Sequence, residues 1–180
     1  MKNLVFILLL IQSLNMSAQE NDPWTQYMTP SDFHGLLSNY EGEFKMEMKM
    51  VGSKDPILVN SSHKMILGGR FLEMRQMGNM MGMDFESILT LGYNTIDHSV
   101  SMTTITNMGT GTLSLQGKWD AETRMATLYG KLTNPVSKNT ILVKQTISLL
   151  DDDTLLIESF DKEGDVPERK TVQYKFVRLP

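Results

Sequence analysis

Apolar and polar residues alternate with a period of two over most of the chain after residue 43. The clearest example is Phe44–Met50, in which Phe and Met residues alternate with Lys and Glu. Successive side chains of a strand point to opposite sides of its sheet, so this pattern is typical of a strand that buries one face. The sequence therefore predicts a protein built mainly from half-buried strands.

The same alternation recurs down to the C-terminus, interrupted by segments rich in Gly, Asn, Asp and Pro. These residue types favour turns, because they accept unusual backbone angles or bond to their own backbone. The predicted strands are 44–50, 57–67, 70–77, 85–93, 98–106, 112–120, 124–132, 141–150, 154–161 and 170–178. A connection rich in glycine and methionine is expected between the third and fourth of them.

One short helix is predicted before the first strand. Thr29–Asp32 supplies a hydroxyl, a proline and an acid, which favour the start of a helix. Phe33, Leu36, Leu37 and Tyr40 then recur at helical spacing. We expect a helix over 31–39, preceded by a loose N-terminal arm over 20–30.

Many short strands separated by turns are typical of a sandwich or a barrel. A single helix before an uninterrupted run of strands favours the barrel, because the helix can plug one end and closure removes exposed strand edges. The predicted fold is all-β, an antiparallel barrel of about 8–10 strands forming one domain over 31–180, with a sandwich as the alternative.

The first nineteen residues have the pattern of a secretory signal peptide. Lys2 precedes the apolar run Leu4–Ile11, and small residues follow at Ser17 and Ala18. Eight apolar residues are too few to cross a hydrocarbon core that needs roughly 20. We expect cleavage after Ala18 or, preferably, Gln19. The mature protein is then periplasmic or secreted, without a membrane anchor.

Composition narrows the chemistry. The chain contains no cysteine, which excludes disulfides, thiolate metal sites and a lipid-modified cysteine. Its formal charge is −4, and loss of Lys2 with the signal makes it one unit more negative. A mildly acidic chain without a basic stripe argues against binding to nucleic acid or to anionic lipid.

Several motifs resemble those of a bacterial family described as domain of unknown function 1579. The similarity spans about 30–178. The matching segments are Leu37 to Gly42, Gly68-Gly69-Arg70-Phe71, Met81-Gly82-Met83-Asp84-Phe85, Gly92-Tyr93-Asn94 and Asn107-Met108-Gly109-Thr110. The resemblance implies a lipocalin-like (calycin) barrel and brings no established activity. Asn94 and Asn107 replace family aspartates, and Phe44 replaces a frequent tryptophan. Asparagine cannot act as a base, which weakens a catalytic interpretation of these positions.

A small barrel holds either packed side chains or one small ligand. We therefore predict binding of a small apolar ligand inside the barrel, with no cofactor. The predicted lining residues are Phe44, Met46, Met48, His63, Phe85, Tyr93, Trp119, Tyr129 and Tyr174. A histidine inside a barrel is more often a hydrogen-bonded core residue than a ligand contact, and this applies to His63. His98 is expected on the surface beside a turn.

A copper-handling protein is one alternative. Met77, Met80, Met81 and Met83 lie within seven residues, and thioethers suit Cu(I). Methionine also fills irregular gaps and lines adaptable apolar pockets. Met46, Met48 and Met50 alternate with charged residues and indicate such a core role in this chain. We therefore favour a structural or pocket-lining role for the methionine cluster over copper binding.

An enzyme that acts at the barrel mouth, such as a hydrolase or isomerase, is a second alternative. The sequence lacks the Gly-x-Ser-x-Gly, His-Glu-x-x-His and phosphate-loop motifs, so binding is favoured over catalysis. Arg70, Arg75 and Arg178 are the candidate inward cations, and the resemblance implies that Arg178 packs across an aromatic ring at the barrel end. A further alternative is an envelope accessory protein that acts through surface contacts.

Overall fold

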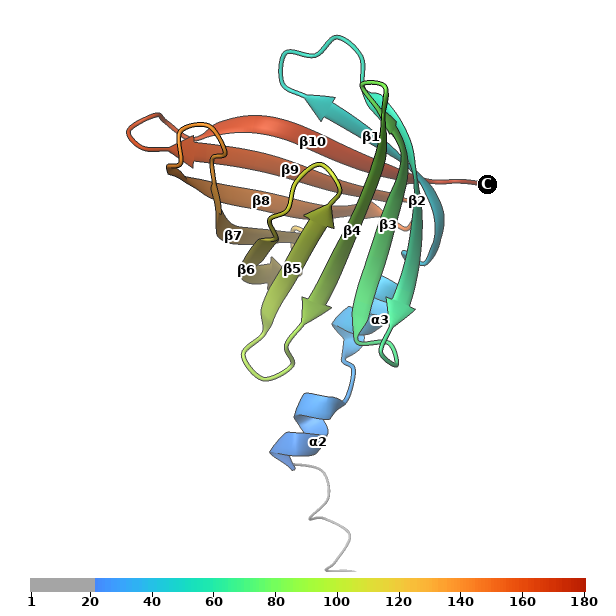
Figure 1. The fold of residues 1–180 in the computed structure, drawn as a ribbon. Helices are drawn as coiled ribbons and strands as arrows, with labels where there is room; N and C mark the ends of the chain where they lie inside the picture. The colour runs from blue at the N-terminus through green and yellow to red at the C-terminus, as the bar shows by residue number, and fades with distance from the viewer. Residues whose placement is uncertain (1–21) are drawn as a thin grey trace, which may run out of the picture.

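The computed structural model describes residues 22–180, so the predicted signal peptide lies outside the described residues (Figure 1). The described chain forms two short helices followed by ten strands. The elements are α2 (Pro23–Met28), α3 (Asp32–Ser38), β1 (Gly42–Met50), β2 (Ile57–Ile66), β3 (Phe71–Met80), β4 (Met83–Tyr93), β5 (Ser99–Thr106), β6 (Leu113–Asp120), β7 (Met125–Thr133), β8 (Thr140–Asp151), β9 (Thr154–Glu163) and β10 (Arg169–Arg178).

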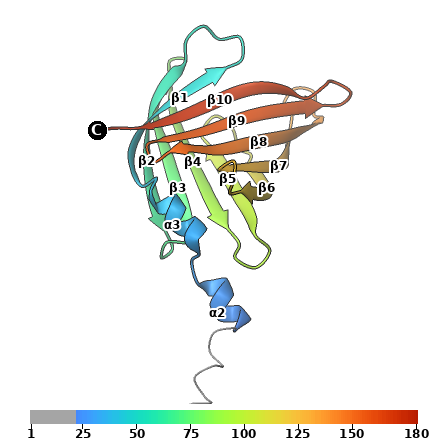
Figure 2. The ribbon, with the colours of Figure 1, turned by 180° about the vertical axis from the view of Figure 1, so that it is seen from behind.

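The ten strands form a closed antiparallel barrel. Each strand pairs with the next along the chain, and β1 pairs with β10 to close the sheet. The closing register places Met46 beside Phe176 and Met48 beside Tyr174. Figures 1 and 2 show the strands wrapping around one interior from opposite sides. The prediction of a barrel is confirmed and the sandwich alternative is wrong.

Helix α3 confirms the predicted N-terminal helix and covers one end of the barrel (Figure 2). Phe33 and Leu37 are buried, and the helix contacts β2, β3 and β4. The arm predicted over 20–30 is not a simple loose segment, because it contains α2. The Asp22 carboxylate accepts a hydrogen bond from the Thr25 N–H at 3.0 Å and so caps this helix.

The connection between β3 and β4 is much shorter than predicted. Both strands run on through the glycine- and methionine-rich segment until Met80 pairs with Met83. The remaining turn consists of Met81 and Gly82, whose φ angles are 53° and 84°. Two central residues with positive φ give the tight hairpin turn whose twist matches that of the strands. The segment is therefore a continuous hairpin rather than a loop.

Candidate functional site

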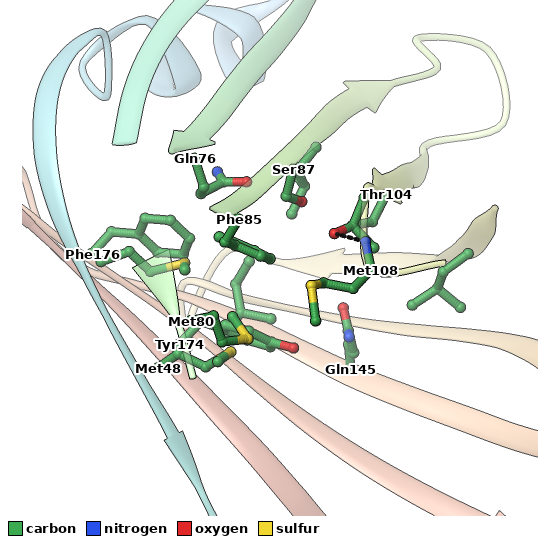
Figure 3. A pocket seen from close by; sticks show the side chains of 15 residues that line it. Met48, Gln76, Met80, Phe85, Ser87, Thr104, Met108, Gln145, Tyr174 and Phe176 are labelled. Carbon is green, nitrogen blue, oxygen red and sulfur yellow. Dashed lines mark hydrogen bonds between the residues drawn. The ribbon is translucent and has the colours of Figure 1, made fainter. Parts of the chain in front are cut away.

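A cavity of about 260 Å³ lies inside the barrel, toward the end opposite α3 (Figure 3). Most of its lining side chains are apolar, and a few polar groups lie among them. The lining residues are Met46, Met48, Gln76, Met80, Phe85, Ser87, Leu89, Thr104, Thr106, Met108, Leu113, Gln145, Ile157, Tyr174 and Phe176.

Strand alternation and register place these side chains together. Along β4, for example, Phe85, Ser87 and Leu89 occupy every second position and all line the cavity. Cross-strand pairs join neighbouring walls, such as Leu89 with Thr104 and Tyr174 with Ile157. Met108, which is 45% exposed, lies in the connection after β5 and lines the cavity. Met108 therefore forms part of the mouth of the cavity.

Gln145 is the least satisfied polar side chain of the lining. It lies on β8 between the buried Val143 and Ile147, and its exposed fraction is 6%. Its Nε2 donates to the Oγ of Ser159, its cross-strand partner, at 3.3 Å. Its Oε1 is buried and has no hydrogen-bond partner among the described residues. Such an oxygen is uncommon in proteins and raises the free energy of the folded state.

The polar side chain on the facing wall, Gln76, is oriented by a chain of hydrogen bonds from the core. His63 Nδ1 lies 3.1 Å from the carbonyl oxygen of Tyr40, and His63 Nε2 lies 2.8 Å from Ser61 Oγ. A carbonyl only accepts, so Nδ1 carries the proton and Nε2 accepts from the Ser61 hydroxyl. Ser61 Oγ then accepts from Gln76 Nε2 at 3.2 Å. This network assigns the Gln76 amide nitrogen to the core side.

The imidazole of His63 is neutral over the ordinary pH range. Burial lowers its pKa to about 4, and the positive charge of Arg178 acts in the same direction. Its ring stacks on Phe44 with centroids 4.1 Å apart. Ser61 is completely buried, is not part of the lining and is separated from the cavity by Gln76. The Ser61–His63 pair therefore belongs to the packed core and not to the cavity wall.

Tyr174 is the one titratable side chain of the cavity lining. Burial raises the pKa of its hydroxyl to about 12, and the negative charge of Asp161 adds to this shift. Burial also raises the pKa of the Asp161 carboxyl. The Tyr174 hydroxyl consequently stays protonated at neutral pH. The lining contains no Lys, Arg, His, Asp or Glu side chain, so the cavity wall is uncharged.

Four of the nine residues predicted to line the barrel interior do line this cavity, namely Met46, Met48, Phe85 and Tyr174. Phe44 and His63 are buried in the packed layer toward α3. Tyr93 and Trp119 contact Phe33 of that helix, with ring centroids 4.7 and 5.0 Å away. These four point into the barrel, but at the end that side chains fill.

Tyr129 is placed differently, since it lies on the outer face of β7 and is 59% exposed. The prediction that it lines the interior is wrong. Its neighbours Leu128 and Gly130 point inward, and alternation puts Tyr129 on the opposite face. The alternation of β7 already contained this information.

Of the three candidate inward cations, only Arg178 packs on a core ring. Its guanidinium lies 4.6 Å from the Phe44 ring centroid, as the resemblance implied, and its Nε bonds Asp153 at 2.7 Å. Arg70 and Arg75 are exposed, so the prediction that they point into the barrel is wrong. Arg70 bonds carbonyl oxygens of the turn after β2, and Arg75 pairs with Glu73 on the outer face of β3. His98 is exposed, as predicted.

The methionine cluster predicted as a copper alternative does not converge. Met80 lines the cavity, whereas Met77, Met81 and Met83 are 60%, 72% and 52% exposed. Residues 22–180 contain no group of three His, Asp or Glu side chains arranged to hold a metal ion. The methionines that do gather around the cavity are Met46, Met48, Met80 and Met108.

Sequence reasoning missed the polar lining residues, above all Gln76 and Gln145. A signal for both is visible in the alternation. Gln76 shares a strand face with Leu72 and Met74, and Gln145 shares one with Val143 and Ile147. A glutamine on the apolar face of a strand indicates an interior polar contact.

None of the helices within residues 22–180 has the length and apolar character needed to span a bilayer.

A search of curated proteins found no match to the chain. A family model described as "Protein of unknown function (DUF1579)" matches residues 29–178. Because this match covers α3 and the whole barrel, the chain belongs to the DUF1579 family.

Proposed function

We propose that this protein is exported and binds one small, mostly apolar molecule in the cavity at the open end of its barrel. The observation that carries the proposal is the contrast within one interior: side chains fill the end under α3, whereas about 260 Å³ is left open at the other end. Ligand sites are concave, mostly apolar and equipped with a few polar groups. This cavity has that character.

The size of the cavity limits its occupant. An apolar cavity of about 150 Å³ accommodates benzene, which has six non-hydrogen atoms. By simple proportion, the cavity holds roughly ten non-hydrogen atoms. Met46, Met48, Met80 and Met108 favour an adaptable fit, because methionine side chains are flexible and polarisable.

Binding is a better proposal than catalysis for this cavity. A hydrolase or isomerase needs acid and base groups that reach the substrate. The lining offers two glutamines, three hydroxyl residues other than Tyr174, and a tyrosine that stays protonated. The buried Ser61–His63 pair would have to be uncovered before it could act on a bound molecule.

A pair of variants on β5 tests the site. Thr104 lines the cavity, whereas its neighbour Thr103 points to the other face of the sheet. Thr104→Phe should fill the cavity and remove a co-purifying small molecule, seen by native mass spectrometry of protein isolated from its own host. Thr103→Phe, the matched control, should retain the molecule. A molecule that stays bound to Thr104→Phe would place the site elsewhere.

Export is tested separately by the mass of the protein recovered from the host. Cleavage after Gln19 leaves a chain that begins at Glu20. Recovery of this species from the periplasm or the medium supports export. A full-length protein found only in the cytoplasm would contradict it without affecting the binding proposal.

A further inference from the structure

The two glutamines of the cavity lie on opposite walls. Gln76 is on β3 and Gln145 is on β8, which are five strands apart in either direction around the ten-stranded barrel. Figure 3 shows Gln76 on one side of the cavity and Gln145 on the other. Both are buried, with exposed fractions of 3% and 6%. The apolar space between them therefore has an amide group at each side.

Both amide groups use their nitrogen for contacts within the protein. Gln76 Nε2 donates to Ser61 Oγ, and Gln145 Nε2 donates to Ser159 Oγ. The orientation of Gln76 follows from the neutral His63. The Ser61 hydroxyl donates its hydrogen bond to Nε2 of that ring, so it can only accept from Gln76. The carbonyl oxygens are thus the atoms left to a ligand. Gln145 Oε1 in particular is buried and unpartnered within the described chain.

Two of the four lining hydroxyl groups, those of Ser87 and Thr106, use their protons within the protein. Ser87 Oγ donates to the Ile105 carbonyl, and Thr106 Oγ1 donates to the Glu86 carbonyl. Their protons are consequently directed to the backbone rather than to the cavity. With no cationic side chain in the lining and the negative charge of Asp161 near Tyr174, the site is poorly suited to a carboxylate. Without an acidic lining residue it is also poorly suited to an ammonium group.

We infer that the ligand carries an uncharged hydrogen-bond donor, a hydroxyl or an amide N–H, which binds Gln145 Oε1 while the rest of the molecule fills the apolar cavity. This inference rests on the proposed function and adds the chemical class of the ligand. A donor from the ligand removes the penalty of the unpartnered oxygen. An acceptor-only group of the same size leaves that penalty in place.

Two probes of equal size test the inference by isothermal titration calorimetry of the purified protein. The first is 1-octanol, which has nine non-hydrogen atoms and one O–H donor. The second is heptyl methyl ether, which has the same number of atoms and only an acceptor. One neutral hydrogen bond should make 1-octanol bind roughly 3- to 10-fold more tightly. Octanoate serves as the anionic probe and should bind more weakly than 1-octanol.

A matched pair of variants on β8 assigns the effect to one atom. Gln145→Leu removes the buried unpartnered oxygen of a residue that lines the cavity. Thr146→Val removes Thr146 Oγ1, the other buried unpartnered side-chain atom among the described residues, which lies on the opposite face of the same strand. The preference for 1-octanol over the ether should disappear in Gln145→Leu and persist in Thr146→Val.

The outcomes separate this inference from the proposed function. Equal affinity of wild-type protein for 1-octanol and the ether, or tighter binding of octanoate, would overturn the inference and leave apolar ligand binding intact. A preference for 1-octanol that survives Gln145→Leu would also overturn it. Failure of all three probes to bind would count against the proposed function itself.

Discussion

The two ends of this barrel are built from the same strands. They differ in how completely side chains fill the interior and in whether its buried polar atoms have hydrogen-bond partners. Under α3, the core is filled by side chains such as Phe33, Leu37 and Phe44, and the buried His63 has a partner at each ring nitrogen. At the other end, a cavity remains and the oxygen of Gln145 has no partner among residues 22–180. The first end is organised for stability, and the second retains unused volume and hydrogen-bonding capacity.

The difference has a simple structural origin. Helix α3 inserts Phe33 against Tyr93 and Trp119, so the core layers nearest α3 have a partner from outside the sheet. The described residues supply no comparable helix at the opposite end, where Met108 is the one lining residue outside the strands. A closed sheet of ten strands needs such an extra element to fill its interior, because the diameter of a barrel grows with strand number.

The largest expected effect compares the same truncation at the two ends. Phe44→Ala should lower the free energy of unfolding by about 3–5 kcal/mol, since Phe44 is fully buried and stacks on His63. Phe85→Ala should cost about 1–2 kcal/mol, because its ring already borders open space. Denaturation in urea measures both. Equal losses would mean that the two ends are packed alike.

The next effect is the pH dependence that His63 adds at the packed end. Its folded pKa of about 4 lies below the unfolded value of about 6.5. Between these values the unfolded chain binds the proton and the folded chain does not. Stability should therefore fall as the pH drops from 6.5 toward 4, by on the order of 3 kcal/mol.

His63→Gln removes this titration and serves as the comparison. The unfolding free energy of each protein is measured from pH 7 to pH 4. His34, whose pKa burial also lowers, is present in both proteins and cancels from the difference. Parallel pH profiles for the two proteins would contradict a strongly depressed His63 pKa.

Arg178 tests the closure of the packed end with a smaller change. Its guanidinium bonds Asp153 and the carbonyl oxygens of Asn39 and Glu41 while it covers Phe44. Lysine keeps the charge but not the planar set of donors. Arg178→Lys should therefore lower stability by about 1 kcal/mol. Arg75→Lys, on the exposed face of β3, should leave the denaturation midpoint unchanged.

The last comparison concerns buried polar atoms, whose removal should have opposite signs at the two ends. Gln145→Leu should raise the stability of the ligand-free protein by about 0.5–1 kcal/mol, because it removes an unpartnered oxygen. Ser61→Ala should lower it by about 1–2 kcal/mol, because His63 and Gln76 each lose a partner. Thermal unfolding curves of both variants measure the signs. A loss of stability in Gln145→Leu beyond the roughly 1 kcal/mol of the Nε2–Ser159 hydrogen bond would show that the oxygen is satisfied after all.

Alternation alone was sufficient to locate the strands. All ten predicted strands are present, and their ends differ by only a few residues from those observed. The main exception is the β3–β4 hairpin, where Gly78 and the methionines predict a connection between strands. Glycine in a strand can serve a close approach, and a Cβ at Gly78 would lie 2.8 Å from the side chain of Val59. Composition could not distinguish this role from a turn.

The sequence by itself determined which faces of the strands point inward, since that depends only on the local period of two. It therefore placed Met46, Met48, Phe85 and Tyr174 correctly inside the barrel. Tertiary structure decided the level of each inward residue along the barrel. That level depends on register, on the closing pair of β1 and β10, and on where α3 docks. These are contacts between distant parts of the chain, so local pattern cannot reveal which interior residues are packed and which surround open space.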